Sequence, residues 1–436
     1  MCVLLGVPGE THAQSLIRDA ETEHIIRGYA DPIFKAAGLV PSSVDIYLIN
    51  DRNINAFVTG GQKMFIHTGL ITELDDPSEI IGIIAHETGH IAGGHLSRAQ
   101  EAMASATVPI ILSTILGAAA MIAGEPEAGT GIMAAGQQIA QRTFLSYSRV
   151  QEASADQAAT SYLQETGQSG KGILKVFKNF ATQEALSARS QDPYARSHPI
   201  SMDRLAALEE KLKASPFFNK EESPAMRSEY ELIKAKVRGF LDQPLTTLRN
   251  YPESRSDRPA RYARAVAYYR IPEINKALAE IDVLLKETPD NPFFNELKGQ
   301  ILFESGQVKQ AIPWHQRSVD LAPNEPLLLI NLAQAQLASE DSTLVEPARI
   351  NLQRSLRIDS ENSAAFFQLA IAHDRQGHQG LAALATAERM YLTGDYSAAR
   401  GQAERAQRNL AVGTPQWLRA EDIKRQAQRE SERRRG

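Results

Sequence analysis

The stretch DPSEIIGIIAHETGHIAGG, residues 76–94, decides how the first half of the chain folds. Its first four residues place an acid before a proline and a glutamate at the third helical position, a combination that starts helices. The double glycine at its other end is typical of a helix that stops or weakens. The sequence therefore predicts a helix over residues 77–92.

Two histidines of this predicted helix, His86 and His90, lie four residues apart, and Glu87 follows the first of them. On a 3.6-residue repeat such histidines lie about 40° apart, so both imidazoles can reach one ion. The pattern HExxH on a helix is typical of zinc peptidases, in which the glutamate activates the attacking water. The alternative interpretation is a pair of surface histidines that happen to have this spacing.

A catalytic zinc ion takes three protein ligands and leaves a fourth position for water, so a third ligand is needed. In one common arrangement a histidine six residues after His90 supplies it, but Leu96 occupies that position. His95 would point about 140° away from His90 on a continued helix. We therefore expect His95 to have a structural role or to support a ligand.

A second helix, expected over residues 149–164, offers the third ligand. Glu152 and Asp156 are four residues apart and share one face of this helix, while Ala153 and Ala155 leave room for close packing. In this arrangement Glu152 binds the metal, and Asp156 accepts a hydrogen bond from a ligating imidazole and fixes its tautomer. Taken alone, the segment could equally be a charged, exposed turn.

Three short β-branched and apolar segments, residues 44–50, 54–59 and 63–67, predict strands. A Gly-Gly turn joins the last two. These strands precede the predicted metal-binding helix, so we expect a small sheet beside it.

Residues 103–123 carry no charged side chain and are long enough to span a membrane. A single crossing would put ligands of one metal on opposite sides of the bilayer. We therefore interpret the segment as part of a helical hairpin that packs on the catalytic domain or lies against a membrane surface.

The C-terminal half repeats with a period of 34 residues, which separates Pro289 from Pro323 and Ala277 from Ala311. This period is the length of a helix-turn-helix tetratricopeptide unit. Small residues at such positions let paired helices approach closely, and each unit buries its apolar face against its neighbour. We expect a curved helical solenoid.

The composition fits a folded chain of several domains, with 436 residues, 43% of them hydrophobic, and a formal charge of -5. The negative charge gives no attraction to nucleic acid, which we exclude as a partner. Residues 1–13 are apolar near their start and end in Thr11-His12-Ala13, a pattern typical of a truncated signal peptide. The alternative is an ordinary disordered N-terminus. We expect an exported protein that can contact a membrane surface through residues 103–123.

The predicted zinc-binding helices resemble those of the HtpX and CAAX-prenyl-protease family of zinc metallopeptidases. With the repeats, the chain is most similar to its tetratricopeptide-containing branch, the periplasmic β-barrel assembly-enhancing proteases. The resemblance rests on the motifs His86-Glu87-Thr88-Gly89-His90, Glu152 with Asp156, Asn55-Ala56-Phe57, Gly69-Leu70, Ser197-His198-Pro199 and Arg204. Ala153-Ser154 departs from the charged residues usual in relatives, and this leaves the ligand assignment intact.

The resemblance implies a gluzincin domain with one zinc ion per chain, held by His86, His90 and Glu152. It also implies that His198 and Arg204 border the active site. Either could steady the oxyanion, or His198 could occupy the open zinc position in a resting state. Residues 63–67 would form an edge strand that pairs with an extended substrate. The substrate-binding residues would be Asn55, Ala56, Met64, Phe65 and Ile66.

The expected fold is mainly α with a small β-sheet, a metallopeptidase domain followed by an α-helical tetratricopeptide solenoid. The predicted organisation is a truncated signal peptide at 1–13, a zinc metallopeptidase domain at 14–215, a helical connection at 216–258, a tetratricopeptide domain at 259–420 and a basic tail at 421–436.

The resemblance implies an endopeptidase that degrades misfolded or stalled envelope proteins, with repeats that bind partners such as the outer-membrane assembly machinery. Chaperone activity would accompany this role. The alternative is a non-proteolytic chaperone or adaptor scaffold with a vestigial zinc site. The intact ligand set with Glu87 favours the enzyme.

Overall fold

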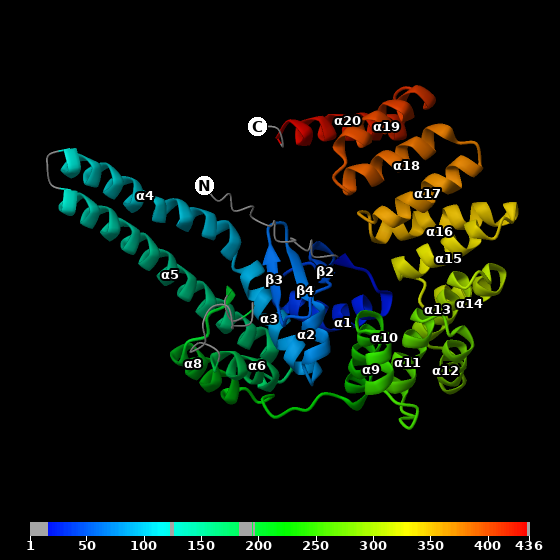
Figure 1. The fold of residues 1–436 in the computed structure, drawn as a ribbon, viewed down its shortest axis with the longest axis horizontal. Coiled ribbons are helices and arrows are strands. Elements are labelled where there is room, and N and C mark those ends of the chain that lie inside the picture. Colours follow the sequence, from blue (N-terminus) through cyan, green and yellow to red (C-terminus); the bar gives the residue numbers. More distant parts are fainter. Residues whose placement is uncertain (1–15, 123–125, 183–193, 195–196, 434–436) are drawn as a thin grey trace, which may run out of the picture. The chain divides into compact units, whose positions relative to one another are not determined.

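A computed structural model of the chain describes residues 16–122, 126–182, 194 and 197–433 (Figure 1). The predicted signal peptide at 1–13 lies outside the described residues. The chain divides into two compact units: one ends at Val237, and the other begins at Arg238 and includes Asp19–Glu21. The domain limits expected from the sequence remain predictions.

The first unit combines a small sheet with helices. Its elements are β1 (Leu16–Ile17), α1 (Ala20–Ala36), η1 (Pro41–Ser43), β2 (Asp45–Ile49), β3 (Ala56–Thr59), β4 (Lys63–His67), α2 (Thr68–Glu73), α3 (Pro77–Ala92), α4 (His95–Ile122), α5 (Pro126–Glu165), α6 (Lys171–Ala181), α8 (Met202–Ala214) and most of α9 (Pro224–Leu241).

The sheet has the strand order β1-β2-β4-β3. β4 runs parallel to β2, with Asp45 opposite Lys63, and antiparallel to β3, with Ala56 opposite Ile66. β4 is therefore an inner strand, and the prediction that residues 63–67 form an edge strand is wrong. Its alternate residues Met64 and Ile66 are fully buried in the core, which is why the strand is apolar.

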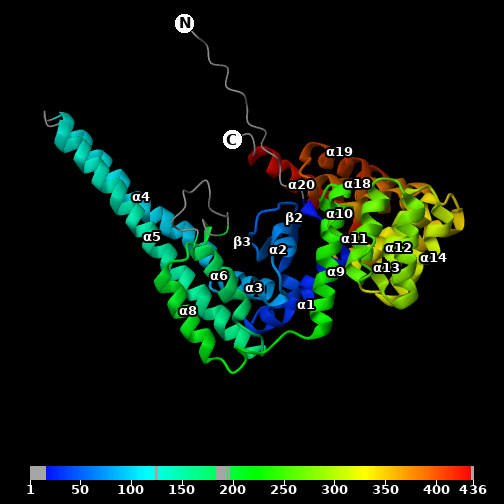
Figure 2. The same cartoon turned by 60° about the horizontal axis from the view of Figure 1, so that its bottom comes forward.

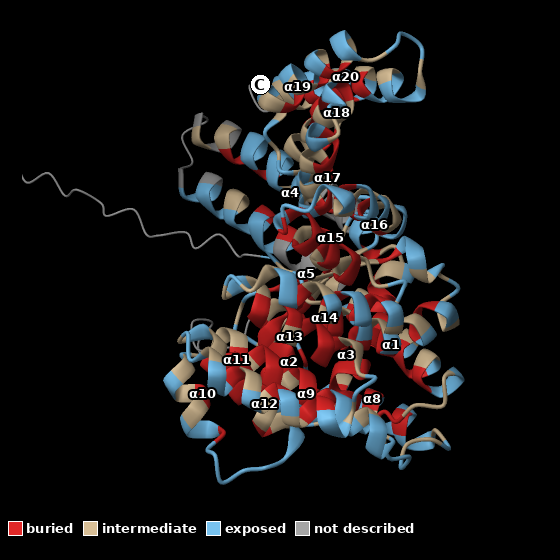
Figure 3. Cartoon of the chain, turned by 90° about the vertical axis from the view of Figure 1, so that its right-hand side faces the viewer, coloured by how far each residue is buried: buried red, intermediate tan, exposed pale blue. Residues whose placement is uncertain are grey.

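α3 is buried along most of its length, from Pro77 to His90. Figure 3 colours buried residues of the chain red. The start of α3 is the one predicted. The Asp76 side chain accepts a hydrogen bond from the Ser78 amide, and the Glu79 side chain accepts one from the Asp76 amide. Gly89 lets α3 approach α5, since a Cβ atom at this position would lie 2.9 Å from Ala155 Cα. The two helices expected to carry metal ligands are thus in close contact.

α4 and α5 run side by side as an antiparallel pair (Figures 1 and 2). The helix expected over residues 149–164 is the last part of α5, which continues unbroken from Pro126. Among the described residues, no helix combines the length and the apolar character needed to cross a bilayer.

The second unit is helical. Its elements are the end of α9, α10 (Pro244–Asn250), α11 (Arg258–Arg270), α12 (Ile274–Glu287), α13 (Pro292–Glu304), α14 (Val308–Leu321), α15 (Pro326–Ala338), η2 (Ser342–Leu344), α16 (Val345–Ile358), α17 (Ser363–Arg375), α18 (Gln379–Leu392), α19 (Tyr396–Asn409) and α20 (Pro415–Arg433).

Successive helices of this unit pack as stacked antiparallel pairs (Figure 1). Gly299 of α13 lies against His315 of α14, where a Cβ atom would sit 2.9 Å from the imidazole ring. Residues 421–433, expected as a basic tail, belong to α20, which buries Ala420, Ile423 and Ala427. The prediction of a mainly α chain with a small sheet and a tetratricopeptide-type solenoid is confirmed.

Candidate metal centre

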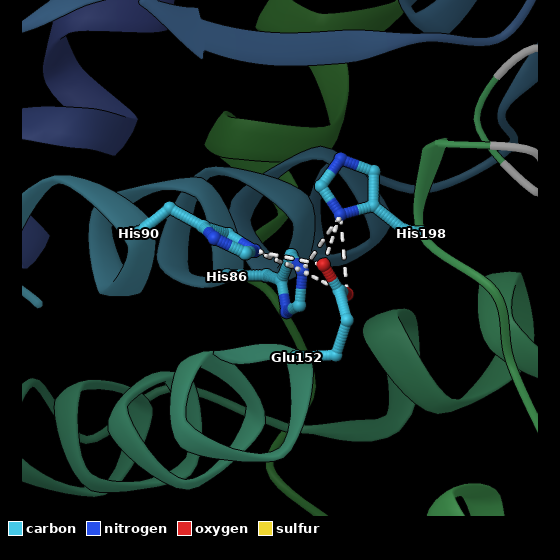
Figure 4. Close-up of side chains that lie close together, drawn as sticks. All are labelled: His86, His90, Glu152 and His198. Carbon is cyan, nitrogen blue, oxygen red and sulfur yellow. Dashed lines mark hydrogen bonds and ion pairs between the residues drawn. The ribbon is translucent and has the colours of Figure 1, made fainter. Parts of the chain in front are cut away.

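Three segments of the first unit converge on one buried point: α3, α5 and the stretch that leads into α8. Figure 4 shows the side chains of His86, His90, Glu152 and His198 turned toward one another. Each offers one nitrogen or oxygen atom, and these atoms lie within 4.8 Å of one another. The structure thus brings together the three predicted ligands and His198.

The separations between these atoms match those of ligands around a single ion. His86 Nε2 lies 3.1 Å from His90 Nε2 and 3.4 Å from His198 Nδ1. Oxygens of Glu152 lie 3.4 Å from both His86 Nε2 and His90 Nε2, and 3.1 Å from His198 Nδ1. Ligands at roughly 2.0–2.1 Å from a tetrahedral metal are about 3.3 Å apart. These five separations are therefore close to those of a tetrahedral metal site, and all four atoms lie within 4.8 Å of one another.

The second ring nitrogens of the two helical histidines are also engaged. His86 Nδ1 lies 3.0 Å from Asp156 Oδ1, the partner predicted from the sequence. His90 Nδ1 lies 3.0 Å from Nδ1 of His95, the first residue of α4. Such contacts fix the ring orientation and leave Nε2 of each histidine directed at the cluster.

Arg204 of α8 connects the carboxylates of α5. Its Nη2 donates to Asp156 Oδ1 at 2.8 Å, and its Nη1 lies 2.9 Å from Glu152 Oε2. Nη1 also donates to the Pro199 carbonyl at 3.0 Å, and the guanidinium carbon lies 5.1 Å from the centre of the Phe177 ring. Arg204 therefore holds the ligand-bearing face of α5, and its donors contact two carboxylates and a backbone carbonyl.

Glu87 is fully buried beside the cluster, and its Oε1 lies 3.5 Å from His198 Nε2. Burial raises the pKa of Glu87 above its ordinary value, although His198 and His86 act in the opposite direction. A carboxylate with a raised pKa is a stronger base than an exposed one. This is the property that proton abstraction from water requires.

The histidines respond to the same environment in opposite ways. Burial opposes protonation of His86, but its hydrogen bonds to Asp156 and Glu152 outweigh burial and raise its pKa to about 9. Burial and the neighbouring His86 lower the pKa of His90 to about 2. For Glu152, burial is outweighed by His198 and His86, which hold the pKa well below its usual range. Ionised carboxylate next to imidazole nitrogens suits a divalent cation.

Two aromatic residues of the site were not predicted. Tyr194 is fully buried, and its ring stacks on His198 with centroids 4.6 Å apart. Phe177 of α6 packs edge-on against His86 at 5.6 Å. Tyr194 stands four residues before His198, and this spacing is the only signal in the sequence that could have indicated it.

The predicted substrate-binding residues do not share one surface. Met64 and Ile66 point into the core, and Phe65 lies between the rings of Tyr47 and Phe57 at 5.1 and 5.0 Å. The edge strands of the sheet are β1 and β3, and β3, which begins at Ala56, packs against α3.

The chain is similar to known proteins across this site. Residues 17–212, which contain every residue of the cluster, match the sequence model of Peptidase family M48. A beta-barrel assembly-enhancing protease of Yersinia pestis is 24% identical over 407 residues, covering 92% of this chain and 82% of that protein. A protein of the same name from Escherichia coli (strain K12) is 24% identical over 331 residues, covering 74% of this chain and 66% of that protein.

Among solved structures, the crystal structure of MamA aligns over 39% of this chain and 95% of the MamA chain, at 17% identity and a TM-score of 0.30.

The family resemblance expected from the sequence is confirmed by the match over residues 17–212. Through these residues the chain is similar to peptidase family M48, and it is a metallopeptidase.

Proposed function

We propose that this metallopeptidase is a zinc-dependent endopeptidase that degrades misfolded or stalled proteins of the bacterial envelope. The observation that carries the proposal is the tetrahedral spacing of His86, His90, Glu152 and His198, with the buried Glu87 beside them. The relatives named beta-barrel assembly-enhancing protease support an envelope role in the assembly of outer-membrane proteins.

We assign the metal as one zinc ion per chain, held by His86, His90 and Glu152. Two imidazole nitrogens and one carboxylate oxygen form the ligand set of many catalytic zinc sites. When bound, zinc supplies Lewis acidity toward a water molecule and toward the scissile carbonyl.

Glu87 acts as the general base and then the general acid. Its carboxylate takes a proton from the attacking water while the water oxygen forms a bond to the carbonyl carbon. The same proton passes to the nitrogen of the scissile peptide bond as the carbon–nitrogen bond breaks. Water is consumed, and one carboxyl group and one amine are produced, so no further reactant is required.

His198 has two roles open to it in this scheme. Its Nδ1 lies 3.1 Å from Glu152 and 3.4 Å from His86, where a fourth ligand would sit, so it can close the site in a resting state. Displaced from that position, it could donate to the oxyanion. For Arg204 we propose a positioning role, because its contacts with Asp156 and Glu152 keep both carboxylates facing the histidines.

The substrate backbone has an edge strand to pair with. β3 is the outer strand on the side of the sheet that packs against α3, so an extended peptide can add to it in the manner of β-augmentation. Asn55 precedes β3, and within the described residues its buried Oδ1 has no hydrogen-bond partner. We propose that this oxygen accepts from a substrate amide. Main-chain pairing would give little sequence selectivity.

The repeats supply surfaces for protein partners. Tetratricopeptide solenoids present extended surfaces that bind polypeptides, and we propose that this one binds assembly partners or unfolded substrates and contributes chaperone activity.

α4 supports the proposed location at an envelope membrane. Its outer face exposes large apolar side chains over residues 108–116. A contiguous apolar patch of this kind is typical of a surface that contacts a protein or a membrane. These residues are Val108, Ile110, Ile111, Leu112, Ile115 and Leu116. Contact of this face with a membrane surface would bury them without a crossing. Sedimentation with liposomes tests this contact, and equal sedimentation of the wild type and an Ile111→Ser, Ile115→Ser variant would contradict it.

Cleavage of casein by the purified full chain tests the catalytic assignment. Glu87→Gln should keep the bound zinc and reduce cleavage by about 10²–10⁴-fold, the usual contribution of a general base. Chelation of zinc should abolish cleavage in the wild type. A Glu87→Gln variant that cleaves casein at the wild-type rate would refute the role of Glu87.

A further inference from the structure

A pocket of about 350 Å³ opens between α17, α18 and α19 of the second unit. Its apolar part includes Ile371 and Phe367, a phenylalanine that is 44% exposed. The remaining wall is polar and contains three arginines. This volume is within the range of about 300–1,000 Å³ typical of ligand sites.

The pocket carries an excess of positive charge in a chain whose formal charge is -5. Arg375, Arg389 and Arg405 line it, and Asp374 is the single acidic residue in its wall. In the part of the chain that the structure describes, no carboxylate oxygen lies within 4.0 Å of any of these three guanidinium groups. Their charge is therefore not neutralised locally.

Several other arginines of the same unit are paired with carboxylates. Arg317 pairs with Asp290, Arg349 with Glu346 and Arg419 with Glu388, at 2.5, 2.5 and 2.6 Å. Three arginines that have no carboxylate partner within the described residues line the same pocket, and this clustering favours an anionic group that comes from outside the chain.

Neighbouring side chains hold two of these arginines in place. The Arg389 guanidinium lies over the Phe367 ring at 4.7 Å from its centre. Arg405 Nη2 donates to Gln379 Oε1 at 3.2 Å, and Gln379 Nε2 donates to Asp374 Oδ1 at 2.9 Å. A guanidinium has five N–H donors, so these contacts leave donors for a carboxylate. The arrangement places cations beside an exposed aromatic ring.

We infer that this pocket binds an extended acidic peptide segment, in which a carboxylate meets Arg389 and Arg405 and an adjacent apolar side chain covers Phe367. The inference rests on the proposed role of the repeats in binding protein partners and names the chemistry of that partner. Arginine clusters recognise acidic motifs through paired hydrogen bonds, and the apolar wall favours a peptide over a small hydrophilic anion.

Fluorescence anisotropy of a labelled peptide of about ten residues, with glutamate alternating with leucine and phenylalanine, tests the inference. A second peptide carries glutamine in place of every glutamate. The protein is the full chain with Glu87→Gln, so that neither peptide is cleaved and the binding result does not depend on peptidase activity. The variants are Arg389→Gln and Arg405→Gln, with Arg408→Gln as the matched control, because Arg408 is an exposed arginine of α19 outside the pocket.

The acidic peptide should bind at least about tenfold more tightly than the glutamine peptide, and each pocket variant should lose about tenfold or more in affinity. Arg408→Gln should bind as the parent does. Equal binding of the two peptides, no saturable binding, or an equal loss in Arg408→Gln would overturn the inference. Displacement of the acidic peptide by inorganic phosphate at the same molar concentration would also overturn it, because the pocket would then be a general anion site. None of these outcomes changes the expectation for casein cleavage.

Discussion

Replacement of Asp156 by asparagine removes the carboxylate that links the metal ligands to their support. Asp156 Oδ1 lies 3.0 Å from His86 Nδ1, and the same carboxylate accepts from Arg204 Nη2 at 2.8 Å. Asparagine keeps one acceptor oxygen and replaces the other with an N–H donor. His86 Nδ1 and Arg204 Nη2 share Oδ1, while Arg204 Nε donates to Oδ2. Whichever oxygen becomes the amide nitrogen, a buried N–H donor then faces another donor.

We expect zinc affinity to fall by about 10–100-fold, the usual cost of losing a carboxylate behind a ligating histidine. This corresponds to about 1.4–2.7 kcal/mol. The loss arises because His86 must donate from Nδ1 so that its Nε2 presents a lone pair to the metal. Arg204 keeps its 2.9 Å ion pair with Glu152, so the fold should survive the change.

Competition for zinc with a fluorescent chelator measures this affinity, and thermal unfolding of the metal-free protein measures the stability of the fold. Asp203→Asn is the matched control, since Asp203 precedes Arg204 in α8 and is exposed. An unchanged affinity in Asp156→Asn, or the same loss in Asp203→Asn, would refute the support that we assign to this carboxylate.

Three further predictions concern other parts of the chain. His198→Ala should raise casein cleavage if this residue closes the resting site and lower it if it steadies the oxyanion; an unchanged rate would exclude both roles. Gly89→Ala should reduce the free energy of unfolding by about 1–3 kcal/mol, because the new methyl group meets the Ala155 backbone at 2.9 Å. If urea unfolding shows the variant to be as stable as the wild type, α3 and α5 are less tightly packed than this distance indicates. Burial lowers the pKa of His315 to about 4, against about 6.5 when unfolded, so the unfolded chain binds the proton more readily. Stability should therefore fall as pH drops from about 6.5 to about 4, by up to roughly 3 kcal/mol, and an NMR titration that placed His315 near 6.5 would contradict this.

The parts of the fold that sequence predicts well are those with local signals. α3 has its predicted bounds because Asp76, Pro77 and Glu79 act within one turn of the helix. The unbroken length of α5 was not predicted, because nothing in the sequence near Arg149 marks the helix as continuous with the preceding hairpin.

Pairings between distant segments account for the error in the sheet. The composition of β4 fits an edge strand as well as an inner one. It is inner because it pairs in parallel with β2, the strand that precedes β3 in the chain, as well as with β3. The site shows the same limit. His86, His90 and Glu152 could be proposed from spacing, whereas the stacking of Tyr194 on His198 and the contacts of Arg204 with two carboxylates follow from tertiary packing alone.

The central claim is that α3 and α5 jointly hold one divalent ion. Inductively coupled plasma mass spectrometry of the purified full chain, compared with Glu152→Gln and the exposed-site control Glu165→Gln, tests it most directly. We expect one zinc ion per chain in the wild type and the control, and little zinc in Glu152→Gln. A folded wild-type protein without stoichiometric metal, or a Glu152→Gln variant with unchanged zinc content, would contradict the claim.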